Sequence, residues 1–313
     1  MDKNNIYAQV LRFFRTSKGL KQKEIFSKHT NKYNRIEAGS TLSVKDWLKC
    51  LEELELTPTE YLQFVNQEDN HILKIDKQFK RTCEDPTFTL NQATLIEYYK
   101  DLSSIEEKST AEFCLYIDIK LFFCEKYQEI DPISSQDTNY FFKLYEKKIK
   151  KQTLFTYYDY RLFSNIIFVL PSYNLSKTEY IFNKMYPVTN SLDRDYSTLY
   201  VAYLAYPNLV NRLIYEKKYD KAQKYLNKAQ QVYIPKNQEL IHTQLKYMQH
   251  LLNYLNTNSS KEFEELQNII IATKTIGNKE LAKQMSKEIN LLSTELPIET
   301  EKGSYPKIEH SIK

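Results

Sequence analysis

Histidine and cysteine are the side chains whose spacing would first reveal catalysis or metal binding, and neither has a suitable pattern in this sequence. The five histidines are scattered, and two of them, His242 and His250, are eight residues apart on one stretch of chain. No HExxH or GxSxG string is present, and no two cysteines form a CxxC pair. The four cysteines (50, 83, 114 and 124) are expected to be free thiols. We therefore expect no enzyme, no metal site and no cofactor.

The composition also argues against nucleotide-binding folds and membrane spans. Only 4 glycines occur in 313 residues, and neither GxGxxG nor GxxxxGK[ST] is found. The apolar stretches are far shorter than the roughly 20 residues that a transmembrane helix needs, and residues 1–21 lack the apolar region of a secretory signal. We expect a cytoplasmic protein without a membrane partner.

The chemistry that the sequence does offer is the binding of an anion. Residues 1–35 carry nine Lys or Arg and two acids, a net charge of 9 − 2 = +7. Residues 36–66 carry two bases and six acids, or 2 − 6 = −4, so the rest of the chain contributes only +1 to the total of +4. A compact basic segment at one end of a neutral chain indicates an anionic partner. The alternative is an ordinary solvated helix face.

The elements that must position these charges are five short helices within residues 1–66. Apolar residues at Ile6, Val10, Leu11 and Phe14 follow helical spacing, and Gly19 suits a left-handed helix end. Further helices are predicted at 22–26, at 31–38 with Thr30 as cap, after Ser43, and from Thr57-Pro58 onward. In the fourth helix the expected inward residues are Val44, Trp47, Leu48 and Leu51.

This arrangement resembles the helix-turn-helix domain of the Xre/Cro family. The resemblance rests on LKQKEI at 20–25, on NRIEAG at 34–39, and on Ser43 opening the next helix. From Gln22 to Glu37 is 37 − 22 = 15 residues, fewer than is usual in that family, so the turn between helices two and three must be short. The resemblance implies that the third helix enters the major groove of DNA.

A reader helix needs polar side chains for base edges and cations for phosphates. The residues expected to reach base edges are Thr30, Asn31, Lys32 and Asn34. Those expected at phosphates are Arg12, Arg15, Lys18, Gln22, Lys23 and Arg35. For Arg35 the alternative is a salt bridge within the domain, and Glu37 is expected to be structural.

After residue 66 the pattern predicts only helices, which makes the chain an all-α protein. Breaks at proline and at Gly277 separate the segments, and Pro207 should kink or split the helix that contains it. The expected segments are 70–82, 91–103, 108–129, 137–150, 153–170, 175–186, 195–215, 218–232, 237–256, 260–275 and 278–293. Tyr219-Asp220-Lys221-Ala222 and Ala229 resemble the second half of a tetratricopeptide motif. The predicted domains are therefore 1–66, a helical solenoid at 67–293 and a C-terminal arm at 294–313.

Stacked helix pairs form a concave surface that suits an extended peptide. Asparagine can bond a peptide backbone as donor and acceptor, and tyrosine offers apolar area with a hydroxyl group. The expected peptide-binding residues are Asn165, Phe168, Tyr200, Tyr203, Asn208, Asn211 and Tyr215. For each asparagine the alternative is a cap or surface position.

The combination of these two parts resembles the peptide-pheromone-sensing regulators of the Rgg/PlcR/PrgX group, and within it the PrgX/TraA type. The strings that carry this likeness are SNIIFVLP at 164–171, MYPVTNS at 185–191 and IIIATKTIG at 269–277. The resemblance implies a repressor of plasmid conjugation genes, a homodimer able to form a tetramer, and a short hydrophobic signalling peptide bound in the helical domain. It also implies that the arm rearranges when an inducing peptide binds.

One rival reading stays open at this point. Some relatives regulate other proteins by direct contact rather than by binding DNA. The basic segment at 1–35 favours double-stranded operator DNA as the partner. Replacing Asn31 and Lys32 by alanine would discriminate between the two readings.

Overall fold

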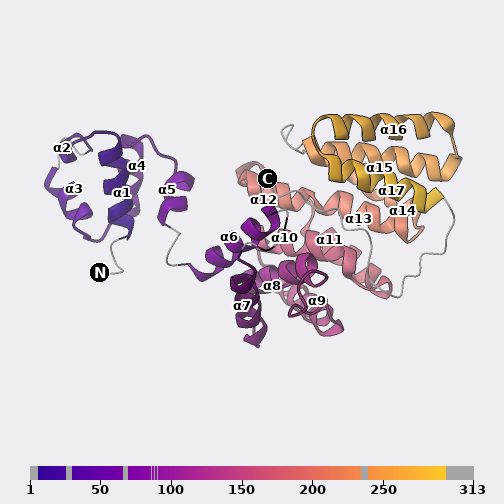
Figure 1. Ribbon diagram of the computed structural model, residues 1–313, viewed down its shortest axis with the longest axis horizontal. Helices are drawn as coiled ribbons and strands as arrows, with labels where there is room; N and C mark the ends of the chain where they lie inside the picture. Colours follow the sequence, from indigo (N-terminus) through magenta and orange to yellow (C-terminus); the bar gives the residue numbers. More distant parts are fainter. Residues whose placement is uncertain are drawn as a thin grey trace. The chain divides into compact units, whose positions relative to one another are not determined.

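The computed structural model describes residues 6–25, 30–65, 70–85, 87, 89, 91–232, 234 and 239–293. Every regular element within these ranges is a helix, which confirms the predicted all-α class (Figure 1). The chain forms two compact units, Met1–Arg81 (unit 1) and Thr82–Lys313 (unit 2). The arm expected at 294–313 lies outside the described residues.

Unit 1 contains the five short helices that the sequence predicts. They are α1 (Ile6–Ser17), α2 (Gln22–Ile25), α3 (Thr30–Glu37), α4 (Val44–Glu53) and α5 (Pro58–Val65). A sixth helix, α6 (His71–Glu84), begins in unit 1 and ends in unit 2. Contacts of α1 with α3 and α5, of α2 with α3, and of α4 with α5 join the first five into one body.

The ends of these helices follow local chemistry. Gly19, with φ of +69°, ends α1 in the left-handed region, where a side chain would be strained. The hydroxyl of Ser43 accepts a hydrogen bond from the Asp46 amide at 3.2 Å, and Thr57 does the same for the Glu60 amide at 3.2 Å. Each bond satisfies one N–H that the first turn of a helix would leave free.

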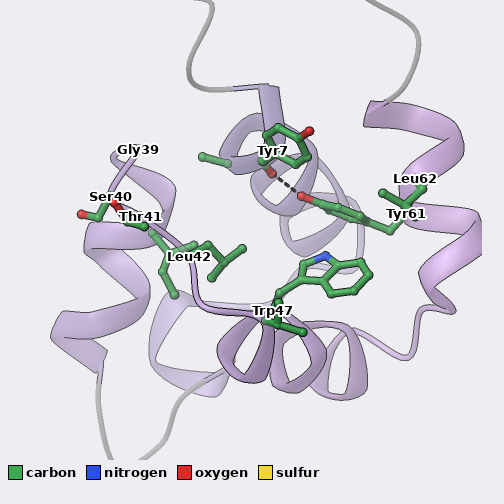
Figure 2. A pocket seen from close by; sticks show the side chains of 11 residues that line it. Tyr7, Gly39, Ser40, Thr41, Leu42, Trp47, Tyr61 and Leu62 are labelled. Carbon is green, nitrogen blue, oxygen red and sulfur yellow. Dashed lines mark hydrogen bonds between the residues drawn. The ribbon is translucent and has the colours of Figure 1, made fainter. Parts of the chain in front are cut away.

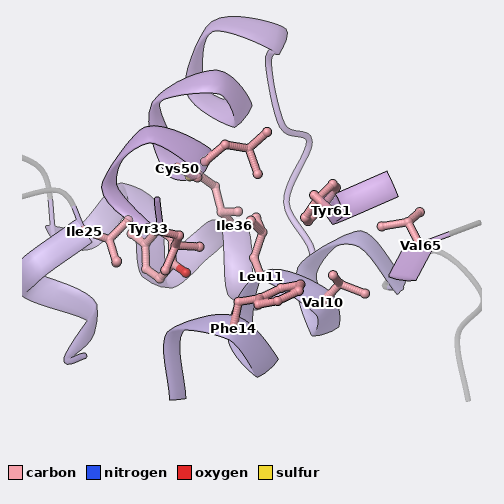
Figure 3. Packing of buried hydrophobic residues seen from close by; sticks show 11 residues of the cluster. Val10, Leu11, Phe14, Ile25, Tyr33, Ile36, Cys50, Tyr61 and Val65 are labelled. Atoms are coloured by element: carbon pink, nitrogen blue, oxygen red, sulfur yellow. The ribbon is translucent and has the colours of Figure 1, made fainter. Parts of the chain in front are cut away.

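One apolar core holds unit 1 together. Side chains from all five helices meet there, including Leu11 of α1, Ile25 of α2, Tyr33 of α3 and Tyr61 of α5 (Figure 3). Cys50 of α4 is buried among them, and that burial raises the pKa of its thiol to about 12. Because α3 contributes Tyr33 and Ile36 to this core, its opposite face is left for solvent.

The register predicted for α4 is partly wrong. Val44 and Leu48 were expected to point inward, yet they are 71% and 49% exposed. The helix instead buries Cys50 and Leu51, with Leu54 at its end, and leaves Trp47 half-buried. Both sets have helical spacing, so the tertiary neighbours decide which face is covered.

Unit 2 is an array of helices, and in its C-terminal part sequence neighbours pack side by side (Figure 1). The α-helices are α7 (Gln92–Ser104), α8 (Thr110–Phe123), α9 (Ser135–Lys150), α10 (Tyr157–Ile166), α11 (Leu175–Met185), α12 (Tyr196–Tyr203), α13 (Ala205–Tyr215), α14 (Tyr219–Gln231), α15 (Glu239–Thr257), α16 (Ser260–Thr275) and α17 (Lys279–Ser293). Short 3-10 turns lie at η2 (Ile167–Val169), η3 (Ser172–Asn174) and η4 (Ser191–Asp193). The adjacent pairs α13 with α14, α15 with α16 and α16 with α17 form the repeat-like end of the array.

Two predicted segments differ from the observed helices. The segment at 195–215 is split into α12 and α13 at Leu204. Pro207 lies in the first turn of α13, where a missing N–H costs no hydrogen bond. The segment at 153–170 becomes α10 and the turn η2, because α10 begins only after Thr156, whose amide and hydroxyl donate to Asp159.

Candidate functional site

The exposed face of α3 is the first candidate site. Tyr33 and Ile36 are buried, whereas Lys32, Asn34 and Arg35 are exposed on the same helix. The backbone of α3 begins at Thr30, as a reader helix requires. The side chains of Thr30 and Asn31, both expected at base edges, lie outside the described part of the structure, as do residues 26–29 before them.

A buried polar cluster fixes how α3 sits against α1 and α2. Arg15 donates to both carboxylate oxygens of Glu37, from Nε at 2.5 Å and from Nη2 at 3.0 Å, and to the Leu20 carbonyl at 2.7 Å. Gln22 donates from Nε2 to Glu37 at 2.6 Å. Burial by itself would raise the pKa of Glu37, but the hydrogen bonds from Arg15 and Gln22 outweigh it and hold that pKa below its ordinary value. Glu37 is therefore ionised and structural at neutral pH.

Arg15 and Gln22 are already engaged within this cluster. Both were expected at phosphates, and both instead hold the end of α3 from within unit 1. A side chain that already bonds a carboxylate in two places is poorly placed to neutralise a phosphate as well. Their effect on a DNA partner would come through the position of α3.

The remaining cations of unit 1 differ in how free they are. Lys18 reaches Glu55 at 3.1 Å, and Lys32 reaches Asp46 of α4 at 2.7 Å. The bond from Lys32, with that from Ser43, lowers the pKa of Asp46. Arg12, Lys23 and Arg35 are exposed and form no ion pair with another described residue. These three cations are therefore open to solvent within the described part of unit 1.

Unit 1 also holds a pocket with a volume of about 610 Å³ (Figure 2). Its walls are Trp47 of α4, Tyr61 and Leu62 of α5, and the loop 39–42. The Tyr61 hydroxyl donates to the Tyr7 carbonyl at 2.8 Å, and Trp47 meets the Tyr61 ring edge-on at 5.7 Å. The walls carry no charged side chain, so this pocket is not part of the basic face.

In unit 2 the predicted peptide-binding residues are mostly engaged with other helices. Asn165 donates from Nδ2 to Asp118 at 2.8 Å, and Asp118 also pairs with Arg161 at 2.8 Å. Phe168 is buried in the turn η2. These residues join α10 to α8, which makes them part of the scaffold of the array.

Asn208, Asn211 and Tyr215 follow one another at helical spacing on α13, and all three are buried. Asn208 is fully buried and donates from Nδ2 to the Ser164 carbonyl at 2.9 Å. On the same helix Arg212 donates to the Ile167 carbonyl at 2.6 Å. These two bonds tie α13 to α10 and η2.

Asn211 and Tyr215 line a small cavity between α13, α15 and α17. Its volume is about 20 Å³, enough for one group the size of a water molecule. The other polar residues of its wall are Gln244, Tyr247, Gln284 and Glu288. Asn211, Tyr215 and Tyr247 lie beside Glu288 in this wall, and the Tyr247 hydroxyl donates to the Met285 carbonyl at 3.0 Å. Burial raises the pKa of Glu288 to about 7.

Sequence reasoning missed Gln244 and Glu288, although a signal was present. Glu288 follows Leu281 and Met285 at i+7 and i+3, within the apolar stripe of α17. Gln244 holds the same position on α15, between Ile241 and Met248. A polar side chain inside an apolar stripe is a sign of a buried polar site.

The last two predicted residues, Tyr200 and Tyr203, lie on α12. Tyr203 is buried, whereas Tyr200 is half-buried and stacks with the exposed Tyr196 at 6.2 Å. Of the seven residues expected at a peptide, Tyr200 and Asn165 are the ones that keep an appreciable exposed area.

The described ranges lack two further kinds of feature. No group of three or more His, Cys, Asp or Glu is placed to hold a metal ion there. None of the helices in that part of the chain is long and apolar enough to cross a bilayer.

Comparisons with known proteins agree with this architecture. Residues 152–287, from just before α10 to within α17, match the family model described as the HTH-type transcriptional regulator Rgg, C-terminal domain. A solved structure of a PrgX mutant has a TM-score of 0.72 at 18% identity, covering 94% of this chain and 98% of that chain. The crystal structure of a PrgX/cCF10 complex has a TM-score of 0.69 at 18% identity, covering 94% and 93%.

The same fold is found in a second named receptor. The structure of the pheromone receptor Rgg2 from Streptococcus dysgalactiae has a TM-score of 0.68 at 14% identity, covering 91% of this chain and 99% of that chain. No curated protein sequence matches the chain. The likeness to the Rgg/PlcR/PrgX group inferred from the residues is thus confirmed: residues 152–287 match the Rgg C-terminal domain, in a chain whose fold is similar to that of PrgX and Rgg2.

Proposed function

We propose that this protein is a sequence-specific DNA-binding transcriptional regulator whose affinity for operator DNA is switched by a short hydrophobic peptide bound in unit 2. The observation that carries the proposal is the pairing of two features in one chain. Unit 1 exposes polar residues of α3 and the cations Arg12, Lys23 and Arg35, and unit 2 contains a segment that matches the Rgg C-terminal domain. Relatives of the same fold were crystallised with the peptides cCF10 and iCF10.

The roles within unit 1 follow from charge and exposure. Asn34 and Lys32, with Thr30 and Asn31 before them, would read base edges in the major groove. Arg12, Lys23, Arg35 and Lys18 would bind phosphates and give affinity without sequence preference. Arg15, Gln22 and Glu37 would set the angle at which α3 leaves the domain.

The finer parts of the proposal rest on the likeness to PrgX. They are repression of conjugation genes on a plasmid, a homodimer that can form a tetramer, a role for residues 294–313 in the switch, and a cytoplasmic location. A peptide can switch the protein only if it binds one assembly or conformation more tightly than another. Coupling of about 1–3 kcal/mol corresponds to a change of about 5- to 150-fold in operator affinity.

Selection of duplexes from a random-sequence library with the full chain tests the first half of the proposal. A common sequence among the retained duplexes is expected, and its absence would favour regulation by protein contact. Titration of the selected duplex with and without synthetic apolar heptapeptides and octapeptides tests the second half. Identical titrations with every peptide would remove the sensing role and leave DNA binding in place.

A further inference from the structure

Glu288 differs from the other buried carboxylates of the described chain. Each of the others has a cation within 4 Å. These pairs are Asp76 with Lys80, Asp118 with Arg161, Asp137 with Lys120, and Asp159 with Lys148. Glu288 is equally buried, but its neighbours are the hydroxyls of Tyr215 and Tyr247 and the amide of Asn211, which carry no positive charge. Burial of a carboxylate without a cation is costly, so the position calls for a positive charge or a proton.

The cavity beside Glu288 contains further groups without partners. Both side-chain amide atoms of Gln244 and the Oε1 of Gln284 are buried and form no hydrogen bond with a described residue. Gln244 is only 1% exposed, so solvent does not satisfy its amide. The cavity thus offers three acceptors, two unpaired amide oxygens and one carboxylate, around a space of about 20 Å³, together with one unpaired donor, the Nε2 of Gln244.

Few chemical groups fit the three acceptors of this cavity. A primary ammonium group has three N–H donors, no acceptor and a positive charge, and its nitrogen is about the size of the water molecule that such a cavity holds. A water molecule would satisfy the amides but would leave the carboxylate charge unbalanced. A divalent metal ion needs several charged or oxygen ligands, and this cavity has one carboxylate.

We propose that the cavity between α13, α15 and α17 binds a primary ammonium group, held by Glu288, Gln244 and Gln284. Gln284 is half-buried, so the substituent on the nitrogen would leave the cavity on its side. No charged residue other than Glu288 lines the cavity, and the titratable groups that face Glu288 are Tyr215 from α13 and Tyr247 from α15. The pKa of about 7 for Glu288 means that an ammonium ion competes with a proton for this site near neutral pH.

Two sources carry this chemistry, a free small amine and the N-terminus of a bound peptide. The second source rests on the proposed peptide-sensing function, because a free N-terminus is an ammonium group that an apolar peptide still has. The first source does not depend on that function. Failure of DNA binding or of peptide sensing would therefore leave the ammonium site to be judged on its own test.

The test is thermal unfolding of the full chain at about pH 8, followed by circular dichroism at equal ionic strength in three salts. Ammonium and methylammonium chloride are expected to raise the Tm of the wild type by at least about 2 °C over tetramethylammonium chloride. The tetramethylammonium ion has the same charge, but it lacks N–H donors and exceeds the cavity. The isosteric variant Glu288→Gln removes the charge and is expected to remove this difference.

A second arm needs no variant. In the wild type at about pH 5, where Glu288 is protonated, the advantage of ammonium is expected to disappear. Equal Tm values in all three salts at about pH 8, or the same advantage in Glu288→Gln, would overturn the proposal. Leucinamide compared with N-acetyl-leucinamide separates the sources. A larger shift from leucinamide than from methylammonium assigns the site to a chain terminus, and a smaller shift assigns it to a free amine.

Discussion

Arg15 and Glu37, 22 residues apart, form a two-point ion pair that joins α1 to the last residue of α3. The side chains are 11% and 5% exposed, so the pair is largely screened from water. The pKa of Arg15 is raised chiefly by its hydrogen bond to Glu37, and the pKa of Glu37 is lowered. The pair therefore fixes the position of α3, the helix proposed to read DNA, relative to α1.

Replacing Glu37 by Gln should lower the free energy of unfolding of unit 1 by about 1–3 kcal/mol, because Arg15 would be left partly buried without its counter-ion. Urea unfolding followed by the fluorescence of Trp47, which is the chain's single tryptophan and lies in unit 1, measures this change. The matched control is Glu55→Gln, which removes an exposed pair with Lys18 and should cost at most about 1 kcal/mol. Equal losses in the two variants would mean that the pair of Arg15 and Glu37 stabilises unit 1 no more than an exposed ion pair does.

The pair of Arg15 and Glu37 also predicts how the stability of unit 1 depends on pH. A carboxyl whose pKa is lowered by folding contributes stability that is present above its unfolded pKa and is lost as the pH falls through the folded value. Protonation of Glu37 should therefore lower the free energy of unfolding of unit 1 as the pH falls below about 4.5. Trp47 fluorescence across an acid titration should show that Glu37→Gln loses stability less steeply than the wild type there. Parallel curves for the two proteins would contradict the assignment.

Replacing Arg35 by alanine should weaken binding to all duplexes by similar factors, because a phosphate contact carries no sequence information. The slope of log K against log salt concentration should decrease by about 0.9 for one lost phosphate. Fluorescence anisotropy of a labelled duplex at several salt concentrations gives this slope, with Lys224→Ala on the exposed surface of α14 as the control of equal charge change. An unchanged slope for Arg35→Ala would place Arg35 away from the phosphates.

The helix ends could be predicted from the sequence because their causes are local. Gly19 must occupy the left-handed region, Ser43 caps its own first turn, and Pro207 fits only near the beginning of a helix. Each of these effects acts within about one helical turn of the residue. The spacing of Asn208, Asn211 and Tyr215 (i, i+3, i+7) likewise puts them on one face of α13.

The partners of these faces could not be predicted, because they come from distant segments. Asn208 meets Ser164 across 44 residues, and Asn211 meets Glu288 of α17, so a face that looked suited to a peptide is covered by the chain itself. In unit 1 nothing in the composition distinguishes Arg15 from Arg12, yet one is paired with Glu37 and the other is exposed. Periodicity identifies which residues share a face and leaves open what covers it.

Replacing Asn165 by alanine should lower stability by about 1–3 kcal/mol, because Asp118 would lose a hydrogen bond inside the protein. Asp118 is fully buried and would keep only part of its compensation, mainly from Arg161. Urea unfolding followed by circular dichroism measures the loss. The exposed Asn227→Ala on α14 should change stability by less than about 0.5 kcal/mol. If Asn165→Ala were as mild as this control, Asn165 would be available for a ligand.

Glu288 should make the stability of unit 2 fall as the pH rises. Folding raises the pKa of its carboxyl from 4.5 to about 7, so the folded protein holds this proton more tightly than the unfolded chain does. The resulting stabilisation is complete below about pH 4.5 and is lost as the pH rises through about 7. A difference of about 7 − 4.5 = 2.5 in pKa corresponds to about 3 kcal/mol.

Glu288→Gln cannot ionise and should escape this loss. Urea unfolding in an amine-free buffer at about pH 5 and about pH 8 should show that the variant gains up to about 3 kcal/mol relative to the wild type as the pH rises. The control is Glu280→Gln on the same helix, where the exposed carboxyl should give no pH-dependent difference from the wild type. If Glu288→Gln and the wild type changed in parallel, the carboxyl would already be balanced by a charge, and both the proton and the ammonium group would have to be excluded from the cavity.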